Sequence, residues 1–175
     1  MDKNYKVKIT LTNDKVINLV LSEKDAPISV ARFLELVKKN YFDGTIFHRV
    51  IDGFMIQTGG YKIVDGALTE LEELEPIKGE FASNGYKDNT ISHKLGVISM
   101  ARTNVKDSAT SQFFICSADC AFLDGEYAAF GYTADEESNE VVKEVAKVKT
   151  YAPHPAFCDF PVEPIGIKTI ELIED

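Results

Sequence analysis

Short runs of strand-forming residues recur along this chain, and only two stretches have the residue spacing of a helix. The first two runs predict a hairpin, because apolar and polar residues alternate up to Leu11, Asn13-Asp14 supplies a turn, and a second run covers Val16 to Leu21. The other strands are predicted at Thr45 to Ile51, Phe54 to Thr58, Gly96 to Ala101, Gln112 to Ser117, Tyr127 to Tyr132 and Gly166 to Ile173.

The two helices are predicted from the spacing of their apolar residues. Pro27 suits the first turn of the earlier helix, and apolar residues at positions 30, 33, 34 and 37 fall on one face. The later helix is predicted around Asn139 to Val148. Many short strands with two helices favour a closed antiparallel β-barrel with helical plugs at its ends, and the 175 residues (1–175) fit one domain.

Two connections between the predicted strands differ in character. Asp52-Gly53 joins two strand-like runs directly. Residues 59–79 are longer: they open with Gly59-Gly60 and continue into an acidic stretch that ends at Pro76. We interpret this stretch as a surface loop with at most a helical turn, and loops of this length are often functional or mobile.

Charge and cysteine content limit the classes of partner. A formal net charge of −9 opposes binding to nucleic acid or to an anionic membrane surface. No signal peptide or membrane span is visible, and an odd, small number of cysteines indicates reduced thiols, so a cytoplasmic location is expected. Cys116 and Cys120 have metal-ligand spacing, but no second Cys/His pair accompanies them, so no metal is expected. The third cysteine is Cys158.

Two segments, residues 47–57 and 111–115, combine large apolar side chains with a few polar ones. Arg49 alone would be read as a solvated surface arginine, but strand alternation gives it the same face as Phe47 and Ile51, where a guanidinium usually serves as a donor for something specific. His48 is either a structural residue or a base. The nearby Phe and Met residues are either core or the walls of a shallow pocket. Because no nucleophile–base pair or phosphate loop is present, the residues suit chemistry without a covalent intermediate or cofactor.

Several motifs in a fixed order carry a resemblance to a known family. Together they are similar to the signature of the cyclophilin family of peptidyl-prolyl cis-trans isomerases, densely from about Tyr41 to Gly131. The motifs are Phe47-His48-Arg49-Val50-Ile51-x-Gly53-Phe54-Met55-Ile56-Gln57, Gly96-Val97-Ile98-Ser99-Met100-Ala101, Ser111-Gln112-Phe113-Phe114-Ile115, Phe122-Leu123-Asp124-Gly125 and Ala129-Phe130-Gly131.

The resemblance implies a mainly β fold, a closed eight-stranded antiparallel barrel capped by two α-helices. It also implies an outer groove for an extended X-Pro peptide and an enzyme that assists protein folding without a cofactor. Arg49 is the implied catalytic residue. The implied substrate-binding residues are Phe54, Met55, Phe114 and Leu123 around the proline ring, Gln57, Ala101 and Gln112 along the peptide backbone, and His48 and Phe122 at the rim.

The chain departs from the family pattern beside the groove. Phe122 stands where many eukaryotic members have tryptophan, and Tyr127, also expected to contact substrate, stands where they often have histidine. Phenylalanine preserves the aromatic wall, which predicts retained activity, but it lacks the indole N–H, which predicts weaker binding of cyclosporin. The acidic insertion at residues 59–79 and a slightly longer segment 104–110 leave the loop geometry and the preference before proline open.

Two alternatives accompany the enzyme hypothesis. One is a peptide-binding or chaperone-like module with weak or no catalysis, and the other is a barrel that holds a small ligand inside. The intact arginine and pocket set favours the enzyme. The expected partners are proline-containing polypeptides, with no nucleic acid and no membrane, and a monomer is the expected state.

Overall fold

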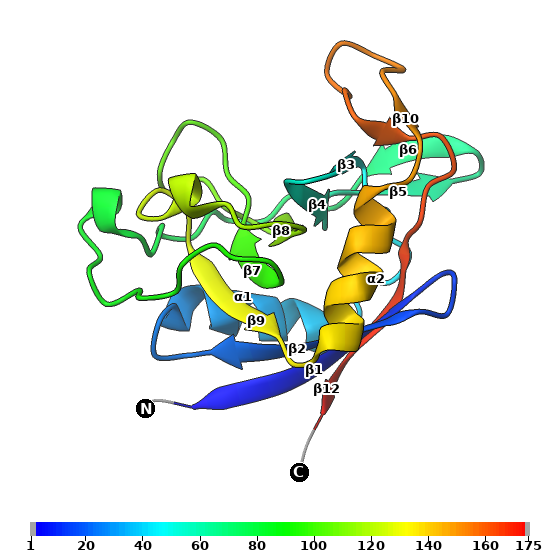
Figure 1. Ribbon diagram of the computed structural model, residues 1–175. Coiled ribbons are helices and arrows are strands. Elements are labelled where there is room, and N and C mark those ends of the chain that lie inside the picture. The colour runs from blue at the N-terminus through cyan, green and yellow to red at the C-terminus, as the bar shows by residue number, and fades with distance from the viewer. Residues whose placement is uncertain (1–2, 174–175) are drawn as a thin grey trace.

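The computed structural model describes residues 3–173, which form one curled antiparallel sheet of eight strands and two α-helices (Figure 1). The strand order in the sheet is β12-β1-β2-β9-β7-β8-β4-β3. The strands of this sheet are β1 Asn4–Leu11, β2 Val16–Ser22, β3 Arg49–Ile51, β4 Met55–Thr58, β7 Val97–Met100, β8 Phe113–Cys116, β9 Ala129–Thr133 and β12 Ile167–Ile173, and the helices are α1 Pro27–Lys38 and α2 Glu136–Ala146.

The predicted first hairpin is confirmed. β1 and β2 pair along their length, and Val7, Ile9 and Leu11 are buried while the residues between them are more exposed. Asp14 takes the positive φ that the turn requires. The period-two pattern therefore sets the register, because a slip of one residue would turn the apolar side chains toward water.

The sheet does not close into a barrel through strand pairing, because its edge strands β3 and β12 are not partners within residues 3–173. Backbone hydrogen bonds bridge the gap instead. The amides of Gly44 and Phe47 donate to the carbonyls of Ile167 and Ile165, at 2.8 and 2.9 Å. The expected eight antiparallel strands and two helices are confirmed, while the closed barrel is replaced by an open but strongly curled sheet.

The strands around the groove divide their residues between two faces. One row, Val50, Ile56, Ile115 and Ile98, pairs across β3, β4, β8 and β7 and lies in the main hydrophobic core. Helix α1 adds Phe33 to this core, where its ring lies 5.3–5.4 Å from three other phenylalanine rings. The alternate residues of the same strands face outward.

Both helices occur where the sequence predicts them. α1 begins at Pro27, and its apolar face contributes buried residues to the core. α2 begins at Glu136, three residues before the predicted start, because Asp135 caps it by accepting a hydrogen bond from the Ser138 amide at 2.8 Å. No helix among residues 3–173 is long and apolar enough to cross a membrane.

The segment 59–79 is not a plain loop. It contains a hairpin, β5 Tyr61–Val64 and β6 Ala67–Glu70, and only the acidic residues after it are irregular. Asp65 and Gly66 both have positive φ, which gives the two-residue turn of a β-hairpin. The sequence prediction was wrong here. Short elements not predicted are η1 Ala82–Asn84, η2 Ala121–Leu123, β10 Thr150–Tyr151 and β11 Phe160–Pro161.

Candidate active site

The centre of the site is a row of side chains on the outer face of the sheet. Arg49 on β3 pairs with Gln57 on β4, and Gln57 pairs with Phe114 on β8. Directly paired residues point to the same face, so these three side chains stand side by side. The next row, Ile51 and Met55, extends the apolar part of this face. Strand register alone therefore places an arginine, an amide and an aromatic ring together.

These residues surround a cavity of about 300 Å³. The cavity is open on one side, and its lining mixes apolar rings with arginine and amide groups, as expected for a peptide-binding site. Its lining residues are His48, Arg49, Phe54, Met55, Gln57, Tyr61, Ala101, Arg102, Phe114, Leu123, Tyr127, Ala156, Phe157 and Cys158.

Arg49 is exposed at the rim of this cavity, and a chain of polar contacts orients it. Its Nη1 donates to Gln57 Oε1 at 3.5 Å, and Gln57 Nε2 donates to Gln112 Oε1 at 2.8 Å. The contact with Gln57 uses one of the five guanidinium donors. Arg49 thus lies beside the apolar cavity with most of its guanidinium donors free of contacts to Gln57.

The apolar part of the cavity is a second hydrophobic cluster, separate from the main core. Met55, Phe114 and Leu123 are its buried members that line the cavity, and Phe54 and Tyr127 pack against them. The ring of Phe114 meets that of Tyr127 edge to face at 5.7 Å. The result is a rigid apolar pocket large enough for a small ring.

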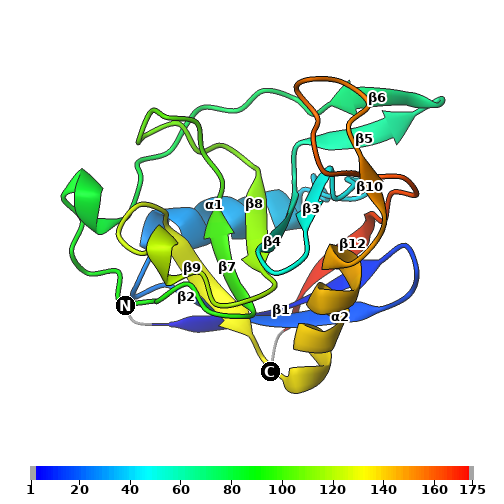
Figure 2. The same cartoon turned by 45° about the horizontal axis from the view of Figure 1, so that its top comes forward.

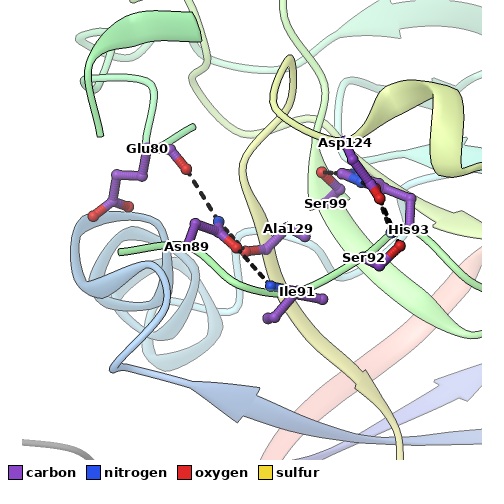
Figure 3. A network of polar contacts seen from close by, with 8 residues as sticks. All are labelled: Glu80, Asn89, Ile91, Ser92, His93, Ser99, Asp124 and Ala129. Carbon is purple, nitrogen blue, oxygen red and sulfur yellow. Dashed lines mark hydrogen bonds and ion pairs between the residues drawn. The ribbon is translucent and has the colours of Figure 1, made fainter. Parts of the chain in front are cut away.

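A buried polar network supports the pocket from behind (Figure 3). His93 lies between Asp124 and Ser99, with Nδ1 2.9 Å from Asp124 Oδ1 and Nε2 2.9 Å from Ser99 Oγ. The His93 ring also stacks on Phe114, with centroids 6.0 Å apart. Ser99 is itself the cross-strand partner of Phe114. The network therefore fixes the pocket wall rather than presenting a nucleophile, since Ser99 and His93 are both buried.

The electrostatics of the network follow from burial. Burial lowers the pKa of His93, and its contact with Asp124 offsets this only in part. Burial alone would raise the pKa of Asp124, but hydrogen bonds from Ser92 and His93 outweigh it and lower that pKa. At neutral pH the network therefore holds a neutral imidazole and a carboxylate.

Asn89 attaches the segment before the network to the sheet (Figure 3). Its Nδ2 donates to the carbonyl of Glu80 at 3.0 Å and to that of Ala129 at 2.8 Å, while its Oδ1 accepts from the Ile91 amide at 3.1 Å. One amide side chain thus joins two loops to β9. This keeps the stretch that carries His93 in register with the strands of the groove.

Arg102 is a cavity residue that the sequence prediction missed. Its Nε and Nη2 donate to the Glu126 carbonyl at 3.0 and 2.7 Å, and its guanidinium lies 4.7 Å from the centroid of the Tyr127 ring. The same guanidinium also lies 4.9 Å from the centroid of the Phe81 ring. Arg102 is therefore a structural clamp between the loops on two sides of the cavity.

The burial of His48 argues against a role as a base, and its Nδ1 has no hydrogen-bond partner among the described residues. It is 7% exposed, and burial first and Arg49 second lower its pKa to about 4. Its ring meets the Tyr61 ring at 4.8 Å. A neutral imidazole of such low basicity is a poor base at neutral pH. The predicted shared face of Phe47 and Arg49 is wrong, because β3 begins only at Arg49 and Phe47 turns into the main core.

Most predicted site residues meet at the cavity. Arg49, His48, Phe54, Met55, Gln57, Ala101, Phe114, Leu123 and Tyr127 line it. Gln112 lines an adjoining cavity of about 190 Å³ that shares Gln57 and Ala101. Phe122 is 72% exposed and lies outside the lining, with its ring tilted against that of Phe54 at a centroid distance of 5.7 Å. Their contacts with substrate stay predictions. The lining residues that the sequence prediction missed are Tyr61, Arg102, Ala156, Phe157 and Cys158.

Metal binding receives no support from the described part of the chain. No group of three or more His, Cys, Asp or Glu side chains there is arranged to hold a metal ion. Cys116 and Cys120 are buried free thiols in the apolar cluster beside the cavity. Burial raises the pKa of both thiols, so they are unreactive neutral groups at neutral pH.

The fold and the site together are a curled antiparallel sheet that carries an apolar cavity on its outer face, with an arginine at the rim of that cavity. The sequence model of the family "Cyclophilin type peptidyl-prolyl cis-trans isomerase/CLD" matches residues 6–172. The chain therefore belongs to the cyclophilin-type peptidyl-prolyl cis-trans isomerases.

Relatives named as peptidyl-prolyl cis-trans isomerases support the same family. Peptidyl-prolyl cis-trans isomerase A of Dickeya dadantii (strain 3937) is 40% identical over 161 residues, 90% of this chain and 80% of that protein. Peptidyl-prolyl cis-trans isomerase B of Escherichia coli (strain K12) is 36% identical over 168 residues, 93% of this chain and 97% of that protein.

Solved structures show the same fold. The crystal structure of the cyclophilin AquaCyp293 from Hirschia baltica matches with a TM-score of 0.73 at 26% identity, covering 97% of this chain and 74% of that one. A cyclophilin-type peptidyl-prolyl isomerase of Cryptosporidium parvum, crystallised in the presence of the dipeptide Ala-Pro, matches with a TM-score of 0.74 at 24% identity. That match covers 97% of this chain and 99% of the other.

Proposed function

We propose that this isomerase accelerates rotation about X-Pro bonds by non-covalent stabilisation of the twisted amide, with Arg49 as the donor. The observation that carries the proposal is the position of Arg49, held by Gln57 at the rim of the cavity that Met55 and Phe114 line. An apolar pocket beside a preorganised cation suits a reaction that moves no covalent bond.

The chemistry requires a donor rather than a nucleophile. Rotation faces a barrier of about 18–20 kcal/mol because the twisted state loses amide resonance. In that state the proline nitrogen becomes pyramidal and regains a lone pair. A guanidinium N–H aimed at this nitrogen stabilises the transition state more than either planar isomer, and this difference accelerates the reaction.

The remaining site residues hold the two halves of the bond differently. The apolar pocket of Phe54, Met55, Phe114 and Leu123 grips the proline ring, so the preceding carbonyl rotates against a fixed half. Gln57, Ala101 and Gln112 offer polar and backbone groups to the peptide along the adjoining cavity. This division predicts that proline-containing segments of flexible polypeptides are the substrates.

One assay separates the enzyme from the peptide-binding module. Exchange between cis and trans forms of a small Ala-Pro peptide is followed by NMR with catalytic amounts of the native chain. The proposal expects exchange that is faster in proportion to enzyme concentration. Binding of the peptide without faster exchange would favour the module, and it would remove Arg49 from its proposed role.

We also propose that cyclosporin binds more weakly here than to a relative with tryptophan at the position of Phe122. Support comes from the exposed ring of Phe122, which packs against Phe54 and has no N–H to donate. Inhibition by nanomolar cyclosporin would contradict this.

A reducing cytoplasmic environment and a monomeric state are further proposals. An exposed free thiol, Cys158, is suited to a reducing compartment. Cell fractionation tests the location, and light scattering at the working concentration tests the monomer.

A further inference from the structure

One side of the cavity comes from a segment with no predicted role. Residues 152–159, between β10 and β11, reach the groove and place Ala156, Phe157 and Cys158 in its lining. In Figures 1 and 2 this segment arches beside the β5–β6 hairpin. Tyr61 of that hairpin lines the same end of the cavity.

Several contacts fix this segment in place. Its base is the β10–β11 pair, and the Val50 amide donates to the Asp159 carbonyl at 3.0 Å. Val50 follows Arg49 directly, so this bond attaches the segment next to the arginine that is proposed to be catalytic. Within the segment, the Phe157 amide donates to the His154 carbonyl at 2.8 Å, which forms a tight turn. These contacts hold residues 152–159 in a defined position, and the segment forms a wall of the cavity.

The surface that this wall presents is aromatic. The Phe157 ring is half-buried and meets the Tyr61 ring edge to face at 5.2 Å, with Phe160 at 6.0 Å behind it. His48, neutral at ordinary pH, forms the floor against Tyr61. The wall therefore lines this end of the cavity with aromatic rings.

The apolar surface continues along the hairpin. Ile63 lies two residues from Tyr61 on β5, so both point to one face, and Leu68 on β6 pairs directly with Ile63. Ile63 and Leu68 are among the exposed large hydrophobic residues. The strip from Phe157 through Tyr61 to Ile63 lies away from the adjoining cavity of Gln112, which includes none of these residues.

We infer that Phe157 and Tyr61 form a specificity subsite that takes a bulky apolar side chain flanking the proline of the client polypeptide. This inference rests on the proposed function, because the occupant is the same peptide whose proline fills the pocket of Met55 and Phe114. The aromatic wall contacts the peptide but not the rotating bond, so it governs which X-Pro sites are favoured rather than the chemical step.

A peptide series tests the subsite. Ala-Pro peptides carry a single phenylalanine at each flanking position in turn, and a glycine peptide serves as the reference. The native enzyme is expected to prefer phenylalanine over glycine about tenfold in kcat/KM at one position, mainly through KM. In Phe157→Ala the preference is expected to fall to about twofold.

The controls separate specificity from folding. Tyr132→Ala removes an exposed aromatic residue on β9, outside the groove, and is expected to leave both rates unchanged. A purely structural role for Phe157 would lower the rates for the phenylalanine and glycine peptides by the same factor, and that result would overturn the inference. So would an unchanged preference in Phe157→Ala.

A second measurement does not depend on activity. Cys158 is an exposed thiol in the cavity lining, while Cys116 and Cys120 are buried. Alkylation of Cys158 by N-ethylmaleimide should be slowed by the phenylalanine peptide more than by the glycine peptide, and equally by both in Phe157→Ala. Protection without faster isomerisation would support the subsite while the proposed function fails. Isomerisation without selective protection would overturn the subsite alone.

Discussion

Strands β3, β4, β7 and β8 carry two apolar clusters, one on each face of the sheet, and the two clusters differ in function. On the inner face, Val50, Ile56, Ile98 and Ile115 join a sealed core of aliphatic and aromatic side chains. On the outer face, the alternate residues form a smaller cluster around Met55 that opens to solvent beside arginine and glutamine. An outer face normally meets water, so a packed apolar cluster there marks a surface that binds something.

The two clusters are also stabilised differently. The inner one relies on interlocked rings and branched chains, whereas the outer one leans on the polar network of His93, Asp124 and Ser99. A buried polar network fixes a unique geometry when all its members are satisfied. The comparison suggests that stability resides mainly in the inner face, and that the outer face trades some stability for a fixed pocket shape.

The largest effect on stability is expected from the inner cluster. Phe33→Ala should lower the free energy of unfolding by about 3–5 kcal/mol, because the ring packs on three other phenylalanines and leaves a cavity when removed. Urea unfolding measures this loss. Activity per folded molecule should stay close to native, and a selective loss of activity would break the division between the clusters.

Acid should destabilise the fold through its buried imidazoles. His48 has its pKa lowered from 6.5 to about 4, so the unfolded chain binds its proton first as pH falls. Stability from this group is complete above pH 6.5 and is lost toward pH 4, by about 3 kcal/mol in total. His93 acts in the same direction. Urea titrations at several pH values measure how the free energy of unfolding changes with pH. This free energy should fall less steeply with decreasing pH in His48→Gln than in the native chain, and an identical pH dependence would refute the role of burial.

The network behind the pocket should matter to both stability and activity. Asp124→Ala removes the partner of the His93 ring and amide, and should cost about 1–3 kcal/mol of stability. Because His93 stacks on Phe114, kcat/KM should fall as well. Asp88→Ala is the matched control, because it removes an exposed carboxylate that lies five residues before His93 in the sequence. Lower stability with unchanged kcat/KM would show that the network does not support the function of the pocket.

The smallest effect is expected at the rim. Phe122→Trp adds an indole N–H, and one hydrogen bond contributes about 0.5–1.5 kcal/mol, so cyclosporin should bind about three- to tenfold more tightly. Isomerisation of a small peptide should change little, since Phe122 lies outside the cavity lining. Isothermal titration calorimetry with cyclosporin measures the two affinities. Equal affinities of the native chain and Phe122→Trp would contradict the role given to the indole N–H.

Local pattern accounts for what the sequence predicted well. The alternation of β1 and β2 and the spacing of α1 are short-range signals, and the motifs around Arg49 and Phe114 place most of the cavity lining. The β5–β6 hairpin was missed although Asp65-Gly66 is a hairpin turn signal, because its strands cover no core and so lack alternation. The acidic residues after it dominated the interpretation.

The misses at the site were long-range contacts. Phe157 meets Tyr61 although the two residues are 96 positions apart in the sequence, and no periodic pattern predicts such a contact. Phe47 was placed on the wrong face because alternation was extended past the start of β3. Arg102 carried a signal, since it directly follows the predicted substrate contact Ala101, but its use as a clamp depends on Tyr127.

The most direct test of the central claim is the rate of Ala-Pro isomerisation by Arg49→Ala beside the native chain, with unfolding measured on the same samples. The account predicts a loss of about 2–4 kcal/mol in transition-state stabilisation, seen in kcat, with stability unchanged because Arg49 is exposed. Arg49→Lys should recover only part of the rate, since it lacks the planar fork. An Arg49→Ala variant as fast as the native chain would contradict the account.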